Sequence, residues 1–176
     1  MTEDELYRQN IEKLMLAGSS ELISNNLPQH AAALLACFFR NATSEVKIFC
    51  NTLRNEVYDT QEVLSSMLAC VRRGIPIQVL VRLEPKEDSK FRSCFIEATK
   101  SQSAKYSLTT NAAEKSQLVK ELGDNFSVMD ARAYRWETDC SNVHAVACMN
   151  APSLAITLGK TFDRLYASTL HAPQLA

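Results

Sequence analysis

Five charged side chains lie within ten positions of one another near the end of the chain: Asp130, Arg132, Arg135, Glu137 and Asp139. Carboxylate oxygens bind divalent cations, and guanidinium groups bind phosphate through paired hydrogen bonds. One hypothesis is therefore a phosphodiesterase or nuclease with a non-standard site, in which the three acids hold a metal ion and Arg135 stabilises charge on the phosphate. Only the clustering of these residues supports this hypothesis.

The same segment alternates between polar and apolar residues over 133–137, which is typical of a strand. Arg135 and Glu137 are two residues apart, so they share one face of that strand. With Arg132, and with His144 on the next predicted strand, they are candidates for lining a phosphate or ligand cleft. The alternative is a solvated or internally paired strand face, with His144 packed and hydrogen-bonded in the core or an interface. We favour this alternative.

Neither a nucleophile motif nor a nucleotide-binding loop can be identified. The chain has four glycines and contains no Gly-x-Gly and no G-x-S-x-G pattern. The phosphate-loop and dinucleotide-binding fingerprints are therefore excluded. Asp130 falls in a predicted turn, where its side chain can bond to the backbone without any catalytic role.

Six cysteines are scattered along the chain without a CxxC pair, so we expect buried small hydrophobic side chains rather than disulfides. Cys140, His144 and Cys148 are spaced by four, which on a helix would stack three metal ligands. Their neighbours are typical of a strand, where four residues span about 13 Å, too far for one shared ion. We predict no metal ion and no cofactor.

Composition and charge indicate one soluble domain. The 176 residues are 46% apolar and 22% charged, and the formal net charge is −1. Nucleic-acid binding needs a surplus of Lys and Arg on at least one face, so this charge does not favour it. Residues 1–10 lack the pattern of a signal peptide, and the longest apolar run, 31–39, is far shorter than the ~20 residues of a membrane span. We expect a cytoplasmic protein without membrane contact.

Hydrophobic periodicity predicts an α/β domain with a mixed sheet. We expect helices at 3–17, 30–41, 60–73, 111–122 and 153–170, a helical centre in 84–105, and strands at 45–51, 75–81, 106–109, 125–129, 133–137 and 142–149. Residues 19–26 are predicted to be a polar connection. The strand–helix–Gly74–strand order predicts a parallel pair with a right-handed crossover. The last three strands follow each other closely, so they are predicted to be antiparallel neighbours.

Two stretches of sequence resemble the phospholipase D-like fold. The first is VKIFCNTL, followed by a helix and CVRRGIPIQVLVR; the second is NFSVMDARAYRWETD, then VHAVACMN and a closing helix with FDRLYAS. The resemblance implies a phospholipase D-like half-domain over 45–170, with a helical extension at 1–44 and a tail at 171–176. Half-domains of this kind commonly pair into two-fold dimers, so the resemblance also implies a homodimer.

The catalytic motif of that family, H-x-K-x4-D, is absent. No histidine in the chain is followed two positions later by lysine. If Asp130 is placed at the motif's aspartate, Gly123 stands at the histidine position and Asn125 at the lysine position. Glu137 and Thr138 stand where the family has its G-S-x-N element. The resemblance therefore implies the fold without the family's chemistry.

The function we predict is a non-catalytic binding or assembly module with a protein partner. The apolar helix at 30–41 is expected to offer surface for a dimer or partner interface. Small degenerate members of this kind resemble accessory components of bacterial multi-gene systems such as phage defence. The alternative is the metal-dependent phosphodiesterase or nuclease described above.

Overall fold

A computed structural model describes residues 2–82, 88–101, 105–110, 125–139 and 144–170. The predicted helix at 111–122 and the predicted tail at 171–176 lie outside these residues. Within the described ranges, none of the helices combines the length and the apolar character that crossing a lipid bilayer requires.

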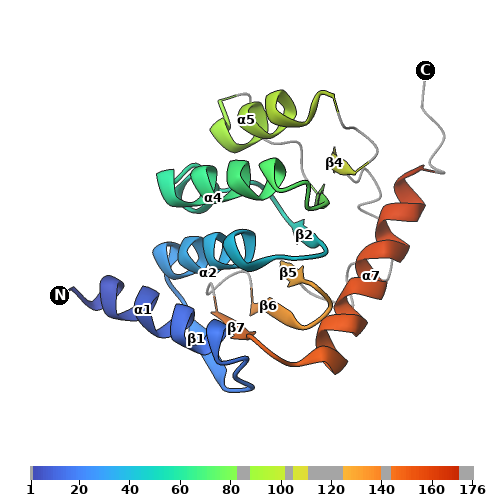
Figure 1. The fold of residues 1–176 in the computed structure, drawn as a ribbon. Coiled ribbons are helices and arrows are strands. Elements are labelled where there is room, and N and C mark those ends of the chain that lie inside the picture. The colour runs from blue at the N-terminus through green and yellow to red at the C-terminus, as the bar shows by residue number, and fades with distance from the viewer. Residues whose placement is uncertain (1, 83–87, 102–104, 111–124, 140–143, 171–176) are drawn as a thin grey trace.

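The molecule has three layers, with a mixed sheet between two layers of helices (Figure 1). The sheet order is β1-β7-β6-β5-β2-β3-β4. The strands are β1 (Leu22–Asn25), β2 (Val46–Cys50), β3 (Ile77–Val81), β4 (Tyr106–Thr110), β5 (Phe126–Met129), β6 (Ala133–Asp139) and β7 (His144–Cys148). The helices are α1 (Glu3–Leu16), α2 (Pro28–Asn41), α3 (Asn55–Tyr58), α4 (Gln61–Arg72), α5 (Lys90–Thr99) and α7 (Pro152–Leu170).

Strand pairing confirms the predicted mixed sheet. β2, β3 and β4 are parallel, whereas β2–β5, β5–β6, β6–β7 and β1–β7 are antiparallel. The crossover from β2 to β3 runs through α3 and α4, and Gly74 follows Arg73, the C-cap residue of α4. Gly74 has φ +75°, and its N–H donates to the carbonyl of Val71 at 2.8 Å, so the glycine accepts a left-handed turn that other residues resist.

The predicted polar connection at 19–26 is wrong, because part of it forms strand β1. Leu22 pairs with Cys148 and Asn25 with Ala145, so β1 extends the sheet beyond β7. Exposed and buried residues alternate along its four positions, with Ile23 and Asn25 buried. A four-residue strand is too short to show clear periodicity, and the open edge of β7 supplies the hydrogen-bond partners that stabilise it. Residues 1–44 thus add a strand as well as helices, and the predicted boundary at residue 44 stays a prediction.

Helix α2 is the centre of the larger core, on the face of the sheet that α1, α4 and α5 also cover (Figure 1). Every residue from Ala31 to Phe39 is at most 3% exposed. The expectation that this helix offers an interface is therefore wrong, because its apolar surface is already buried against the sheet and against α1 and α4. The opposite face packs on α7, where Phe49, Phe126 and Phe162 form a second core.

The described cysteines behave as the sequence predicts. Cys37, Cys50, Cys70 and Cys148 are buried and free, and Cys94 is half-buried and free. Burial raises the pKa of the Cys37 thiol to about 12, so this side chain is protonated at neutral pH.

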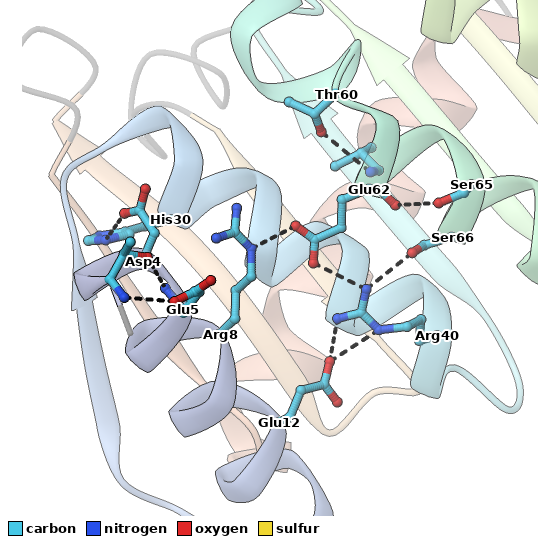
Figure 2. A network of polar contacts seen from close by, with 12 residues as sticks. Asp4, Glu5, Arg8, Glu12, His30, Arg40, Thr60, Glu62, Ser65 and Ser66 are labelled. Atoms are coloured by element: carbon cyan, nitrogen blue, oxygen red, sulfur yellow. Dashed lines mark hydrogen bonds and ion pairs between the residues drawn. The ribbon is translucent and has the colours of Figure 1, made fainter.

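A network of hydrogen bonds and ion pairs connects α1, α2 and α4 on the outer side of the large core (Figure 2). Arg40 near the end of α2 lies at its centre and pairs with Glu12 of α1. Its Nη1 also donates to Glu62 Oε1 at 3.3 Å and to Ser66 Oγ at 3.2 Å, both on α4. Arg8 of α1 completes the network through a 2.9 Å contact with Glu62 Oε2.

Candidate functional site

Polar side chains cross the sheet in a row where β2 and β6 end and β5 begins. Asn25 of β1 is paired with Ala145 of β7, which in turn is paired with Glu137 of β6. The next position in the row is Asn125, whose carbonyl accepts a 2.8 Å hydrogen bond from the N–H of Glu137. Side chains two apart on a strand share a face, so Arg135 joins this row on the side covered by α2.

The row holds a buried ion pair. Arg135 is 6% exposed and Glu137 3%, and their Nη1 and Oε2 atoms are 3.4 Å apart. Arg135 Nε donates a 3.0 Å hydrogen bond to Asn25 Oδ1, and Asn125 Nδ2 donates at 3.0 Å to Glu137 Oε2. The second carboxylate oxygen, Glu137 Oε1, is buried and has no hydrogen-bond partner. A buried carboxylate oxygen without a donor is costly, and it marks this position as unusual.

Both residues of this ion pair line a small pocket of about 30 Å³. Its lining combines apolar and polar residues. The lining consists of Ala31, Leu35, Phe49, Cys50, Thr52, Arg54, Val57, Tyr58, Asn125, Ser127, Arg135 and Glu137. The pocket is therefore built by α2, by the end of β2 with the turn and α3 that follow, and by β5 and β6.

Two of the potential nucleophiles in the pocket, Cys50 and Tyr58, are kept protonated by their surroundings. Burial raises the pKa of the Cys50 thiol to about 12. Burial also raises the pKa of Tyr58 well above its ordinary value. Since the thiolate and the phenolate are the reactive forms, neither side chain is activated at neutral pH. No histidine is among the residues that line the pocket.

Two of the predicted cleft residues, Arg135 and Glu137, come together, whereas Arg132 lies elsewhere. Arg132 follows the β5–β6 turn, at the opposite end of β6 from Glu137. Its guanidinium Nη1 donates to the carbonyl of Met149 at 3.3 Å, and its Nη2 lies 3.5 Å from Met15 Sδ. Arg132 thus connects the turn to the end of β7 and to α1.

His144 also lies outside the pocket. It is the first residue of β7, is paired with Asp139 of β6, and is exposed. The prediction that His144 is packed in the core is therefore wrong, whereas its alternative, an interface histidine, stays a prediction. The first position of a strand at the edge of the described segment leaves the ring in solvent, which the apolar neighbours in the sequence did not indicate.

The candidate metal ligands are not assembled. All six hydrogen bonds of the Asp130 carboxylate go to the backbone and hydroxyl groups of residues 43–45, at 2.8 to 3.1 Å. Asp130 and Glu137 are separated by the length of β6, about 13 Å or more at 3.3 Å per residue. Among the described residues, no group of three His, Cys, Asp or Glu side chains could hold a metal ion.

Several pocket residues were not candidates at the sequence level. Asn25 lies in the segment predicted as a connection, and Arg54 and Tyr58 lie in the stretch between a predicted strand and helix. Asn125 was considered only as the replacement for a catalytic lysine. Their positions were the available signal. Except for Asn25, each of these residues lies close to the end of a strand predicted from the sequence, and sheets of this type present their sites at strand ends.

No protein-family model matches the chain, and no curated protein sequence does. Solved structures are similar to it. Nuc from Salmonella typhimurium, a phospholipase D family member, has a TM-score of 0.59 at 12% identity, over 84% of this chain and 94% of that one. NucT from Helicobacter pylori has a TM-score of 0.54 at 12% identity, over 84% and 98%. The archaeal chromatin protein TrmBL2 has a TM-score of 0.59 at 10% identity, over 93% of this chain and 60% of that one.

These likenesses show that the chain has a phospholipase D-like α/β fold, as the sequence predicts. In the resemblance described above, Asn125 stands at the position of the catalytic lysine, and Glu137 stands at the first position of the G-S-x-N element. Both residues line the pocket and are hydrogen-bonded to each other. Gly123, at the position of the catalytic histidine, lies outside the described residues.

Proposed function

We propose that this protein is a non-catalytic binding module, a homodimeric accessory component of a bacterial multi-gene system that acts in the cytoplasm. The observation that carries the proposal is the Asn125–Glu137–Arg135–Asn25 network at the position of the family's catalytic groups. Each described polar group there is engaged in holding the strands together, except for one carboxylate oxygen. A pocket without an activated nucleophile is suited to binding rather than to bond cleavage.

Asn125 supports a non-catalytic role most directly. Its Oδ1 accepts a 2.6 Å hydrogen bond from the N–H of Asn51, just after β2, while its Nδ2 donates to Glu137. The side chain therefore connects the ends of β2, β5 and β6. An amide in this position carries no charge to offer a phosphate and no lone pair basic enough to attack phosphorus.

The likeness in fold supports the proposed homodimer. Half-domains of the phospholipase D type commonly pair about a two-fold axis. The structural match covers 94% of the Nuc chain and 98% of the NucT chain, so each of these chains is about one such half-domain long. The similar chromatin protein TrmBL2 binds DNA. The net charge of −1 gives this chain no general surplus for phosphate neutralisation, so we favour a protein partner.

Hydrolysis assays test the absence of catalysis. We expect no cleavage of bis(p-nitrophenyl) phosphate or of single- and double-stranded oligonucleotides, with or without Mg²⁺ or Mn²⁺. A phosphodiesterase of known activity is the positive control. Turnover that requires a divalent cation and disappears in Glu137→Ala would contradict the proposal and support a metal-dependent phosphodiesterase.

Light scattering after gel filtration tests assembly. We expect twice the mass of the chain, unchanged when a short oligonucleotide is added. A monomer at micromolar concentration from which no protein partner can be isolated would contradict the assembly role. A mass increase with the oligonucleotide would point to nucleic acid as the partner.

A further inference from the structure

The pocket contains one hydrogen-bond acceptor that the protein leaves unused. Glu137 is 3% exposed, and its Oε1 atom has no partner, although its Oε2 atom accepts from Asn125 and contacts Arg135. Buried polar atoms are nearly always hydrogen-bonded, and a free carboxylate oxygen loses its hydration without replacement. Among the described residues no side chain or N–H donates to this oxygen, so it is open to a donor group of a bound molecule.

The space beside the ion pair fits one small group. A cavity needs about 10–15 Å³ to hold a water molecule, so about 30 Å³ admits one or two atoms of that size. A second hollow of about 290 Å³ shares Thr52 and Arg54 with the pocket and continues over Leu53, Asn55 and Glu56. A larger molecule can thus insert one polar tip while its remaining atoms stay in the outer hollow.

The charges beside Glu137 Oε1 determine which chemical group can bind there. Arg135 and Glu137 compensate each other, and both are buried. A cation placed on Glu137 Oε1 would lie next to the Arg135 guanidinium, and an anion would be repelled by the carboxylate. Desolvating a charged group without a counter-charge is costly, so this position favours a neutral group that donates a hydrogen bond.

The apolar lining of the pocket agrees with a neutral organic ligand. Leu35 and Val57, which belong to the core under α2, line the pocket and offer contact to carbon atoms next to the donor group. Ligand sites of this kind combine apolar walls with a few polar groups that set orientation.

We propose that this pocket binds a small neutral organic molecule through one hydroxyl or amino group, which donates a hydrogen bond to Glu137 Oε1. The donor comes from a sugar hydroxyl or from the amino group of a nucleobase, which share this chemistry. The inference rests on the proposed function, because a binding module needs a ligand, and it names the class of that ligand.

Titration calorimetry with ribose and with adenine tests the inference, using ammonium and inorganic phosphate as charged probes. We expect a neutral probe to bind and both charged probes to fail. Binding of ribose alone assigns the donor to a sugar hydroxyl, and binding of adenine alone assigns it to a base.

Two variants examine the site in different ways. Glu137→Gln replaces the acceptor, and Ser127→Val fills the pocket while the ion pair is kept. Each variant should weaken binding about tenfold or more. Glu137→Gln removes the hydrogen bond to a charged acceptor, and Ser127→Val blocks access to that acceptor. Glu97→Gln on the exposed side of α5 is the matched control and should bind like the wild type. Thermal unfolding of each variant verifies that it is folded.

Three results would overturn the inference. They are binding of ammonium or phosphate in place of the neutral probes, binding of none of the probes, and neutral binding that Ser127→Val leaves unchanged. In the second case the pocket holds water only. None of these results bears on catalysis or on dimer formation. The hydrolysis assays and the mass measurement therefore test the proposed function independently of this inference.

Discussion

Asn125 Nδ2 donates a 3.0 Å hydrogen bond to Oε2 of Glu137, and both residues line the same small pocket. The bond links the start of β5 to β6, and the same amide also holds the N–H of Asn51 beyond β2. A lysine introduced at position 125 would lose the contact with Asn51, because an ammonium group cannot accept its N–H. The amide of Asn125 therefore acts as donor and acceptor at once where these strand ends meet.

The buried ion pair makes Glu137 important for stability. We expect Glu137→Ala to reduce the free energy of unfolding by about 3–5 kcal/mol, because it leaves the Arg135 guanidinium buried with Asn25 as its remaining side-chain partner. Chemical denaturation measures this loss. The double variant Arg135→Met/Glu137→Ala should recover part of it, since no charge is then left unpaired.

A comparison with an exposed carboxylate checks this explanation. Glu97→Ala, on the exposed side of α5, should cost less than about 1 kcal/mol. If Glu137→Ala costs as little as Glu97→Ala, the pair does not stabilise the strand ends.

The β5–β6 turn is predicted to carry strain at Ala131. Asp130 has φ +53° and Ala131 has φ +51°, and Arg132 N–H donates to the Met129 carbonyl at 3.1 Å. This is a two-residue turn of the type that favours glycine. Ala131→Gly should raise the free energy of unfolding by up to about 1 kcal/mol and raise Tm. A lower Tm would show that the turn does not strain the alanine.

Asp130 is predicted to make stability depend on acidic pH. Burial acts to raise the pKa of its carboxyl, but hydrogen bonds from the N–H groups of Glu45, Ser44 and Thr43 outweigh it and hold the pKa below its ordinary value of 3.8. A lowered folded-state pKa contributes stability above the unfolded value, and this contribution is lost as pH falls through the folded value.

Asp130→Asn tests this at constant backbone geometry, because asparagine also tolerates the positive φ. We expect a loss of roughly 2 kcal/mol at neutral pH, the size of hydrogen bonds to a charged acceptor. The difference between variant and wild type should shrink below about pH 3.8 in denaturation curves. A difference independent of pH would mean that charge on Asp130 plays no part.

The polar network between α1, α2 and α4 should depend on its central arginine (Figure 2). Arg40 contacts Glu12, Glu62 and Ser66, whereas Arg8 contacts Glu62 alone. Since these side chains are about a third exposed, we expect Arg40→Ala to cost about 1 kcal/mol and Arg8→Ala less.

Denaturation at low and high salt completes the comparison. High ionic strength should reduce the cost of both variants because it screens exposed charges. Equal costs for Arg40→Ala and Arg8→Ala would show that the network adds nothing beyond single pairs.

Long, strongly patterned segments were predicted well. Helices α1, α2, α4 and α7, the parallel pair β2–β3 and the antiparallel strands β5, β6 and β7 all follow from periodicity and from the glycine at 74. Strand β1 was missed because four residues carry little pattern. The α2 interface was predicted wrongly, because an apolar sequence indicates burial without saying whether the covering surface belongs to the same chain.

The sequence by itself determined that the family's histidine and lysine are missing and that Arg135 and Glu137 share a strand face. The tertiary structure decided what this face does. Only strand order brings Asn25 and Asn125 beside the pair, because these residues are a hundred positions apart in the chain yet each is hydrogen-bonded to one member of it. Only packing under α2 removes water from Glu137 and leaves one oxygen unpartnered, since burial depends on neighbours that no local pattern specifies.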